Sequence, residues 1–347
     1  MRQIPILLIL LALTADCVGQ SQPTGSPAQS ASPSPSLAEA ERKLEHGLNQ
    51  EAIQILLQLT AAQPPEKGAS RELGIAYYRT SKLIDAEKSF AQAIIEDPND
   101  IESIQMRGLT LYRLGRPGDA IPFLERVRQW TPDANADANY VLGLCYLNTQ
   151  RYDDALRAFA AQYGVDPASA AALLLTAQMF VHANLEDLAS EKARAALKLS
   201  PNIPLAHFLL GEVALSKSDL PHALEQFEQE RAINPSYAAV YDRLGDVFTR
   251  TGQYQQAQES LTKAISLDQS TTGPFILMGR VFLRRNDPQT ALMYLQHAEK
   301  MDPGNYITHT LLGQAFKSLG KDEDAKRELE TASKIHSASQ LKLQPVQ

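Results

Sequence analysis

Histidine and cysteine are the side chains best suited to hold a metal ion or to act as nucleophiles, and this sequence has few of them. It contains two cysteines and seven histidines, His46, His182, His207, His222, His297, His309 and His336. No two of these histidines lie three or four residues apart, which is the spacing that places two ligands on one helical face. The sequence therefore predicts no metal site and no cofactor.

The two cysteines have different surroundings. Cys145 lies between Leu144 and Tyr146, which predicts a small buried apolar side chain rather than a nucleophile. Cys17 lies in an apolar N-terminal segment that we expect to be cleaved off or lipid-modified. Cys145 then has no partner for an intramolecular disulfide, so the fold does not depend on oxidation.

Motifs of known catalytic chemistry are absent from the sequence. It has no G-x-S-x-G, H-E-x-x-H or C-x-x-C segment. Residues 313–321 end in Gly-Lys like a phosphate-binding loop, but the two glycines are too far apart and Asp322 follows the lysine. We therefore predict that the protein is not an enzyme.

Composition narrows the classes of partner. The 347 residues carry a formal net charge of -7 and an isoelectric point near 5.6, so no overall positive field attracts nucleic acid. Hydrophobic residues make up 44% and aromatic residues 7%, which is typical of a helical protein whose core is rich in small side chains.

The N-terminus has the pattern of a targeting segment. Arg2 precedes an apolar run from Ile4 to Leu13, which is shorter than the roughly 20 residues needed to span a bilayer. We predict a signal peptide over residues 1–19 and a periplasmic or secreted protein. The alternative is a lipid anchor at Cys17 and attachment to the outer membrane, because residues 13–17 resemble a lipobox, although Asp16 departs from that motif.

Residues 20–35 are mostly serine, proline, glutamine and alanine. This segment has no large apolar side chain to offset the entropy lost on ordering. The sequence predicts a disordered tether here.

A period of 34 residues runs through the rest of the chain. Glycines recur at this spacing or close to it at Gly74, Gly108, Gly143, Gly211, Gly245, Gly279 and Gly313, with Ala177 in the remaining slot. Twelve positions later an alanine recurs, at Ala86, Ala120, Ala155, Ala189, Ala223, Ala257, Ala291 and Ala325. Twelve further on comes a proline, at Pro98, Pro132, Pro167, Pro201, Pro235 and Pro303. Such a period indicates stacked copies of one structural unit.

These positions resemble the tetratricopeptide repeat, and residues 67–100 match its pattern almost throughout, with Leu73, Gly74, Tyr77, Ala86 and Phe90. The resemblance implies an all-α fold, a right-handed superhelical solenoid of about nine helix-turn-helix repeats. We expect the solenoid over residues 36–339, with repeats starting near 33, 67, 101, 136, 170, 204, 238, 272 and 306, and a tail over 340–347. Gly115, Gly252 and Gly320 are predicted to break the chain between the two helices of a repeat.

In this family the first helix of each repeat lines a concave groove. Carrying the groove positions onto this sequence gives Arg71, Tyr78, Arg79, Gln105, Tyr112, Arg113, Tyr140, Asn148, Gln178, His182, Phe208, Glu212, Asp242, Asp246, Arg250, Arg280, Arg284 and Lys317. Tyrosine and arginine are typical of protein-binding hot spots, although packing between helices is an equal alternative for the tyrosines. The last four cations form a basic stripe that suits an acidic peptide or a chain carboxylate; a merely solvated face is the alternative.

The sequence therefore predicts an exported, non-catalytic scaffold that binds a protein or peptide in its groove, in envelope assembly or secretion. Two alternatives stay open, a lipid-anchored outer-membrane assembly factor and an accessory subunit of an envelope enzyme or carbohydrate-handling complex. Because the tail is short, we also expect an exposed apolar face on the last repeat, where copies of the chain could associate.

Overall fold

The computed structural model describes residues 36–130 and 136–342, and the side chains of residues 138–338 within the second range. This part of the chain forms eighteen helices arranged as nine consecutive pairs. The first helices of the pairs are α1 (Leu37–Glu45), α3 (Ala69–Arg79), α5 (Ile101–Arg113), α7 (Ala136–Asn148), α9 (Ala170–His182), α11 (Ala206–Ser216), α13 (Ala238–Arg250), α15 (Gly273–Arg284) and α17 (Tyr306–Ser318). The second helices are α2 (Asn49–Ala61), α4 (Leu83–Glu96), α6 (Pro117–Trp130), α8 (Tyr152–Gln162), α10 (Glu186–Leu199), α12 (Leu220–Ile233), α14 (Tyr254–Leu267), α16 (Pro288–Met301) and α18 (Asp322–Lys342).

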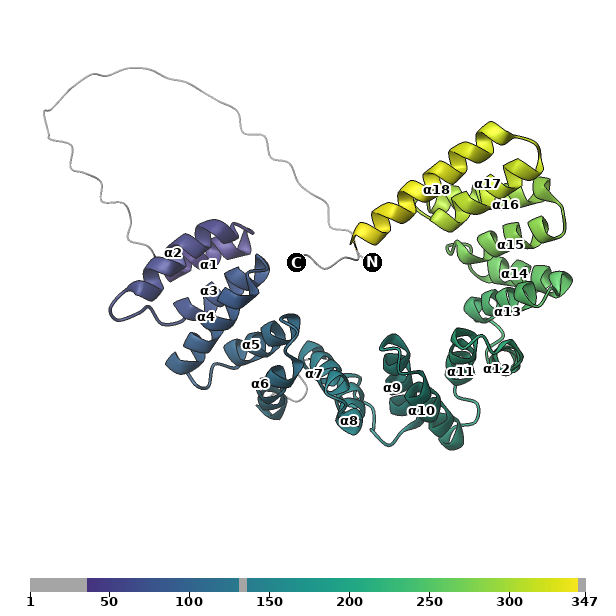
Figure 1. Ribbon diagram of the computed structural model, residues 1–347. Helices are drawn as coiled ribbons and strands as arrows, with labels where there is room; N and C mark the ends of the chain where they lie inside the picture. Colours follow the sequence, from purple (N-terminus) through teal and green to yellow (C-terminus); the bar gives the residue numbers. More distant parts are fainter. Residues whose placement is uncertain (1–35, 131–135, 343–347) are drawn as a thin grey trace, which may run out of the picture.

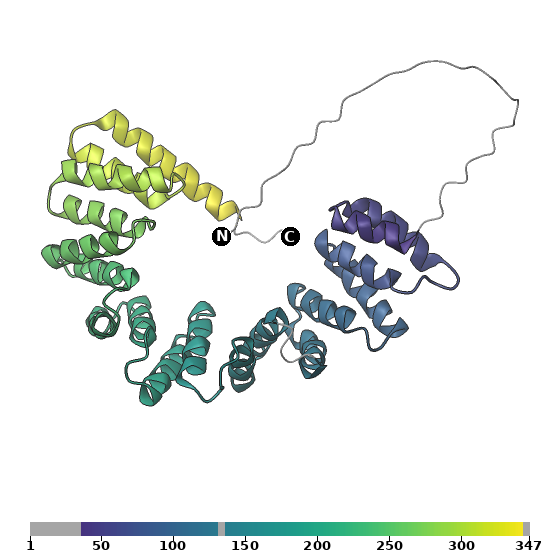
Figure 2. The same ribbon diagram turned by 180° about the vertical axis from the view of Figure 1, so that it is seen from behind.

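The pairs stack into one open arc, with the purple and yellow ends facing each other across the opening (Figure 1, and from behind in Figure 2). In the middle of the arc α5, α7, α9 and α11 lie on its inner side and their partner helices on its outer side. First helices of neighbouring repeats also contact each other directly, as α3 does α5 and α15 does α17. The first helices therefore form the inner surface of the arc, and the all-helical repeat fold predicted from the sequence is confirmed within the described residues.

The recurring glycine is where the two helices of a repeat come closest. A Cβ built on Gly74 would lie 2.6 Å from the ring of Phe90, and one on Gly211 would lie 2.5 Å from the ring of Phe227. Sixteen residues separate the two members of each pair, and that second position is phenylalanine or leucine in every repeat that has the glycine. Two repeats have alanine in place of the glycine. Ala177 is matched by Ala193 sixteen residues later, so the side chain added on α9 is offset by a smaller one on α10, whereas Ala40 is matched by Leu56; all four are fully buried.

The turns between the two helices of a repeat need a left-handed residue. Gly115, Gly252 and Gly320 have φ angles of 73°, 76° and 71°, so the predicted breaks lie where the sequence placed them. Other repeats place ordinary residues in the same turn, such as Ser81 and Gln150, each with a φ angle of 60°. Asn184 and Asn286, with φ angles of 57° and 60°, also occupy this turn, and asparagine tolerates the left-handed region better than serine or glutamine does.

The C-terminal helix is longer than the sequence suggested. Helix α18 runs past residue 339, the expected end of the array, to Lys342, and is 21 residues long. Leu329 is the one large apolar side chain that its described residues leave exposed, and Lys326, Arg327 and Glu330 around it are charged. The described residues of α18 therefore expose mostly polar side chains, and self-association through the last repeat stays a prediction.

No described helix is both long enough and apolar enough to cross a membrane. The predicted signal peptide (1–19), the lipidation candidate Cys17, the tether (20–35) and the last residues of the tail lie outside the described residues.

Candidate functional site

The first helices carry all of the predicted groove residues, with differing exposure. Arg79, Arg113, Tyr140, Asn148, His182, Arg250, Arg284 and Lys317 are exposed. Arg71, Tyr78, Gln105, Tyr112, Gln178, Phe208, Glu212, Asp242 and Arg280 are half-buried, and Asp246 is buried. Exposure on the inner side of the arc is necessary for partner binding. A polar group that is already paired within the chain contributes less to ligand binding than an unpaired one.

The tyrosines predicted for the N-terminal groove divide between packing and exposure. Tyr112 packs against the core that α5, α7 and α8 share, and burial raises the pKa of its hydroxyl. The Tyr78 ring lies under the Arg113 guanidinium, whose Cζ is 4.5 Å from the ring centroid. Tyr140 is 37% exposed, although its ring also lies 6.1 Å from that of Phe159. The stacked pair of Tyr78 and Arg113 thus links two neighbouring repeats on the groove side.

Arg71 and Arg79 of the predicted groove already have partners within the chain. Arg71 forms ion pairs with Glu72 at 3.1 Å, Glu102 at 3.5 Å and Asp100 at 3.8 Å. Arg79 donates a hydrogen bond of 2.8 Å to the Leu44 carbonyl oxygen in the preceding repeat. Both side chains hold neighbouring repeats together. Arg71 is neutralised by the carboxylates around it, whereas Arg79 keeps its charge because a carbonyl oxygen carries none.

In the middle of the predicted groove, one residue packs in the core and another forms an ion pair within the chain. Phe208 contacts the rings of Phe227 and Tyr237, with centroids 5.7 and 5.2 Å away, so it belongs to the core that joins α11 to α13. Glu212 accepts a hydrogen bond of 2.6 Å from Nε of Arg243. Exposed polar groups in this region are Asn148, whose amide donates to the Leu144 carbonyl oxygen, and His182.

The two aspartates of the predicted groove are both paired with arginines of α13. Asp242 forms an ion pair with Arg243 at 3.1 Å, and Asp246 forms one with Arg250 at 2.8 Å. Burial raises the pKa of Asp242, the largest effect on that carboxyl. Arg250 is therefore neutralised within α13, and the stripe reduces to the three cations that follow it.

Those three cations lie beside a pocket between α15 and α17. The pocket has a volume of about 510 Å³ and is lined by Arg280, Leu283 and Arg284 of α15 and by Tyr306, Ile307, Thr310, Leu311, Gln314 and Ser318 of α17. Lys317 precedes Ser318 on α17 and is exposed. Within the described part of the chain none of Arg280, Arg284 and Lys317 forms an ion pair. We call this feature the arginine pocket.

Cys145 and the Gly-Lys segment at residues 313–321 have structural roles. Cys145 is fully buried, and burial raises the pKa of its thiol to about 12, so the reactive thiolate is not formed at neutral pH. Gly313 lies within α17 and faces Leu329, while Gly320 forms the left-handed turn after that helix. Residues 313–321 are therefore a helix and a turn, not a loop that could surround a phosphate.

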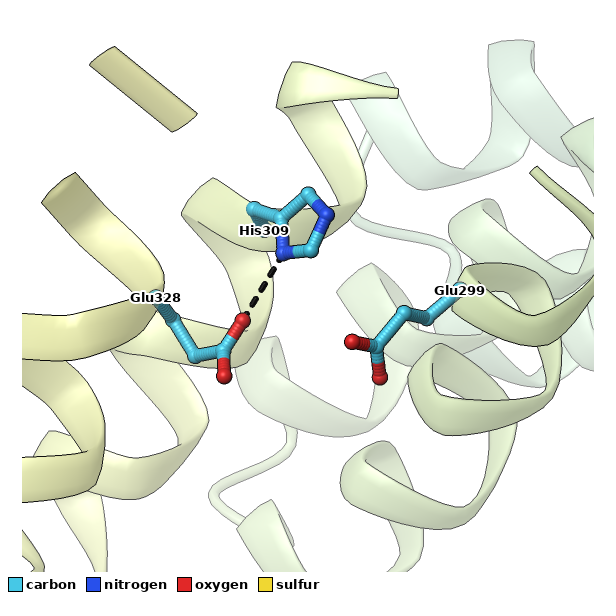
Figure 3. A group of neighbouring side chains, drawn as sticks. All are labelled: Glu299, His309 and Glu328. Atoms are coloured by element: carbon cyan, nitrogen blue, oxygen red, sulfur yellow. Dashed lines mark hydrogen bonds and ion pairs between the residues drawn. The ribbon is translucent and has the colours of Figure 1, made fainter. Parts of the chain in front are cut away.

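The search for histidines three or four residues apart did not find one cluster of potential metal ligands. His309 of α17 lies between Glu299 of α16 and Glu328 of α18, and Figure 3 shows both carboxylates on the same side of its ring. His309 and Glu328 come from facing positions of the two helices of one repeat, 19 residues apart. His207 and Gln226, also 19 residues apart, make the equivalent contact at 2.8 Å. That inter-helix spacing, rather than spacing along one helix, is the sequence signal that finds the pair.

Comparison with known proteins gives a consistent family assignment. Family models described as tetratricopeptide repeat match residues 111–179, residues 37–101 and 187–238, and residues 238–271. A curated relative, the Protein bimA of Emericella nidulans, is 24% identical over 190 residues, which is 55% of this chain. The chain spans only 23% of that relative's length.

Solved structures with related architecture have low sequence identity. The Cut9 and Hcn1 hetero-tetramer of APC/C gives a TM-score of 0.45 at 16% identity, over 80% of this chain and 55% of that one. MamA from Desulfovibrio magneticus RS-1 gives 0.45 at 16% identity, over 49% and 96%. YrrB, described as a TPR protein with an unusual peptide-binding site, gives 0.42 at 20% identity, over 49% and 88%. From its matched repeats and its nine helix pairs, this chain belongs to the tetratricopeptide repeat family.

Proposed function

We propose that this protein is a non-catalytic scaffold that binds an acidic peptide segment of a partner protein in the arginine pocket. The observation that supports it is that, among the described residues, Arg280, Arg284 and Lys317 form no ion pair and the two arginines line a pocket. Elsewhere on the inner surface Arg71 and Arg250 are neutralised within the chain, Arg79 is hydrogen-bonded to a carbonyl oxygen and Arg113 is stacked on Tyr78.

The composition of the pocket favours a peptide over an isolated anion. Arg280 and Arg284 are four residues apart, so they project from the same face of α15. Leu283, Ile307 and Leu311 give the lining an apolar part beside the guanidinium groups. A volume of about 510 Å³ is in the range of ligand-binding sites. A segment with carboxylates flanking an apolar side chain satisfies both parts, because guanidinium groups bind carboxylates through paired hydrogen bonds.

Export remains part of this proposal on sequence grounds. The apolar run of residues 4–13, the Ser/Pro-rich stretch of residues 20–35 and the single cysteine in the repeats fit a protein working outside the cytoplasm. Its partner would then be an envelope or secreted protein. Fractionating cells that express the full chain tests this part, because a chain found only in the cytosolic fraction would exclude it.

Fluorescence anisotropy with defined peptides tests the binding site. The probes are a labelled ten-residue peptide of glutamates around one phenylalanine and its counterpart with lysines in place of the glutamates. We expect the acidic peptide alone to bind, with an affinity that falls as salt rises. Arg280→Ala with Arg284→Ala should weaken binding at least about tenfold, since a hydrogen bond to a charged group contributes about 1.5–3 kcal/mol.

Arg285→Ala is the matched control for the binding assay. Arg285 is exposed one residue beyond Arg284, but its Nη1 donates to Gln258, away from the pocket lining. The control should bind the acidic peptide as the unaltered chain does. Equal binding of both peptides, or equal loss in the control and in the pocket variant, would exclude the arginine pocket as the site.

A further inference from the structure

Three side chains from three consecutive helices converge near the C-terminal end of the arc. Glu299 of α16, His309 of α17 and Glu328 of α18 each place one potential ligand atom within 4.8 Å of the other two. His309 is 5% exposed and Glu328 is 9% exposed, while Glu299 is half-buried and open to solvent. In Figure 3 the Glu299 carboxylate faces the space beside the His309 ring across from Glu328.

The contacts of His309 fix the orientation of its ring. Nε2 lies 3.0 Å from the carbonyl oxygen of Pro303. A carbonyl oxygen only accepts, so Nε2 carries a hydrogen and donates it. Nδ1 lies 2.8 Å from Oε2 of the Glu328 carboxylate, which also only accepts, so Nδ1 donates a hydrogen there and releases it when a metal ion binds. Histidines that bind metals commonly have this arrangement, with one ring N–H held by a backbone carbonyl and the other nitrogen directed at the ion.

The cluster carries more negative than positive charge. Two carboxylates face one imidazole. Among the described residues Glu299 has no ion pair, and the arginine nearest Glu328 is Arg327, whose Nε is 3.7 Å from Oε1. A bound divalent cation would neutralise both carboxylates at once.

We propose that Glu299, His309 and Glu328 bind a divalent transition-metal ion, with Zn²⁺ as the best match. The ligands are Nδ1 of the histidine and one oxygen of each carboxylate, leaving a further position for water. One imidazole with two carboxylates suits zinc, whereas Mg²⁺ and Ca²⁺ prefer sites made of oxygen alone. Tetrahedral zinc with bonds of about 2.0–2.1 Å separates its ligand atoms by about 3.3–3.4 Å. The contact of 2.8 Å between Nδ1 and Oε2 of Glu328 lengthens by about 0.5 Å as the ion enters. Rotation of the half-buried Glu299 side chain brings the third ligand closer.

The ion would fasten the last helix of the array to the two helices before it. Glu299 belongs to the preceding repeat, whereas His309 and Glu328 belong to the two helices of the next one. Metal binding would therefore add a link between these two repeats and stabilise their packing. This inference does not depend on peptide binding in the arginine pocket.

Zinc titration of the tag-free, metal-stripped full chain tests the site. We expect calorimetry to give one Zn²⁺ per chain and the melting temperature to rise with zinc concentration. Glu299→Gln should weaken zinc binding at least about tenfold, and this variant should fold, because the Glu299 carboxylate has no ion pair to lose. Glu330→Gln, an exposed glutamate on α18, is the matched control and should bind zinc as the unaltered chain does.

A second measurement does not depend on any variant. With Co²⁺ in place of Zn²⁺, NMR should show one strongly shifted exchangeable proton from the Nε2–H of His309. Excess Mg²⁺ should not remove this signal. The proposal is overturned if the chain binds no zinc, if Glu299→Gln binds zinc as tightly as the unaltered chain, if Glu330→Gln weakens binding equally, or if the shifted proton is absent or lost to Mg²⁺.

Discussion

The close approach at the recurring glycine can be tested at Gly211. A Cβ added there would meet three atoms of the Phe227 ring at 2.5, 2.7 and 2.9 Å, and that ring is fully buried. Overpacking a core of this kind costs about 1–3 kcal/mol. Replacing glycine by alanine inside a helix returns about 0.8–1.0 kcal/mol. With a rigid ring and three close contacts, we expect Gly211→Ala to lower the free energy of unfolding by about 1–2 kcal/mol.

The pair Ala177 and Ala193 in the neighbouring repeat suggests how to separate the two effects. Phe227→Ala should cost about 3–5 kcal/mol by leaving a cavity. In that background the clash is gone, so adding Gly211→Ala should now stabilise the protein by up to about 1 kcal/mol. The sign of the Gly211→Ala effect should thus reverse between the two backgrounds, which a double-mutant cycle measures directly.

Urea unfolding followed by circular dichroism is the assay for all four proteins of this cycle. Gly118→Ala is the control, because a Cβ there meets nothing nearer than 3.9 Å, and it should be neutral or slightly stabilising. If Gly211→Ala is neutral or stabilising in the unaltered chain, or if its effect has the same sign in both backgrounds, the reasoning about helix approach is wrong.

Three further predictions concern the fourth repeat. Cys145, fully buried with its thiol pKa raised to about 12, should react with iodoacetamide only after unfolding; rapid labelling of the native protein at pH 7.5 would contradict this. Gln150 has a φ angle of 60°, so Gln150→Gly should raise the free energy of unfolding by about 0.5–1 kcal/mol, as measured by urea unfolding. A lower free energy of unfolding in this variant would contradict the prediction. Burial raises the pKa of Asp154, but hydrogen bonds from Arg151 and Arg157 outweigh this and lower it. Its contribution is therefore present at neutral pH and lost as the pH falls through the lowered pKa. The melting temperature of Asp154→Asn should therefore fall less at acid pH than that of the unaltered chain. The same dependence of melting temperature on pH in both proteins would exclude the effect.

The fold could be predicted from residue type at positions where the local structure requires one kind of residue. Gly74 and Gly211 permit the close approach of two helices, and Gly115 permits a left-handed turn, so both features could be found by period alone. Ser81 and Gln150 occupy the same turn without any such preference. Packing of the two flanking helices imposes that conformation, and no local signal could have revealed it.

The binding surface was harder to predict because exposure and pairing depend on neighbouring repeats. Sequence position placed both Arg71 and Arg284 in the predicted groove. Their difference comes from Asp100 and Glu102 of the next repeat, which neutralise Arg71. The Glu299, His309 and Glu328 cluster was missed for a related reason, since its members come from three helices.

The most direct test of the proposed function is peptide selection from a random library on two forms of the full chain. One form is unaltered and the other carries Arg280→Glu with Arg284→Glu, which reverses the charge of the arginine pocket. We predict that the unaltered chain selects acidic peptides with an apolar residue and that the reversed form selects basic ones. A selection without acidic preference in the unaltered chain, or the same consensus from both forms, would contradict the proposal.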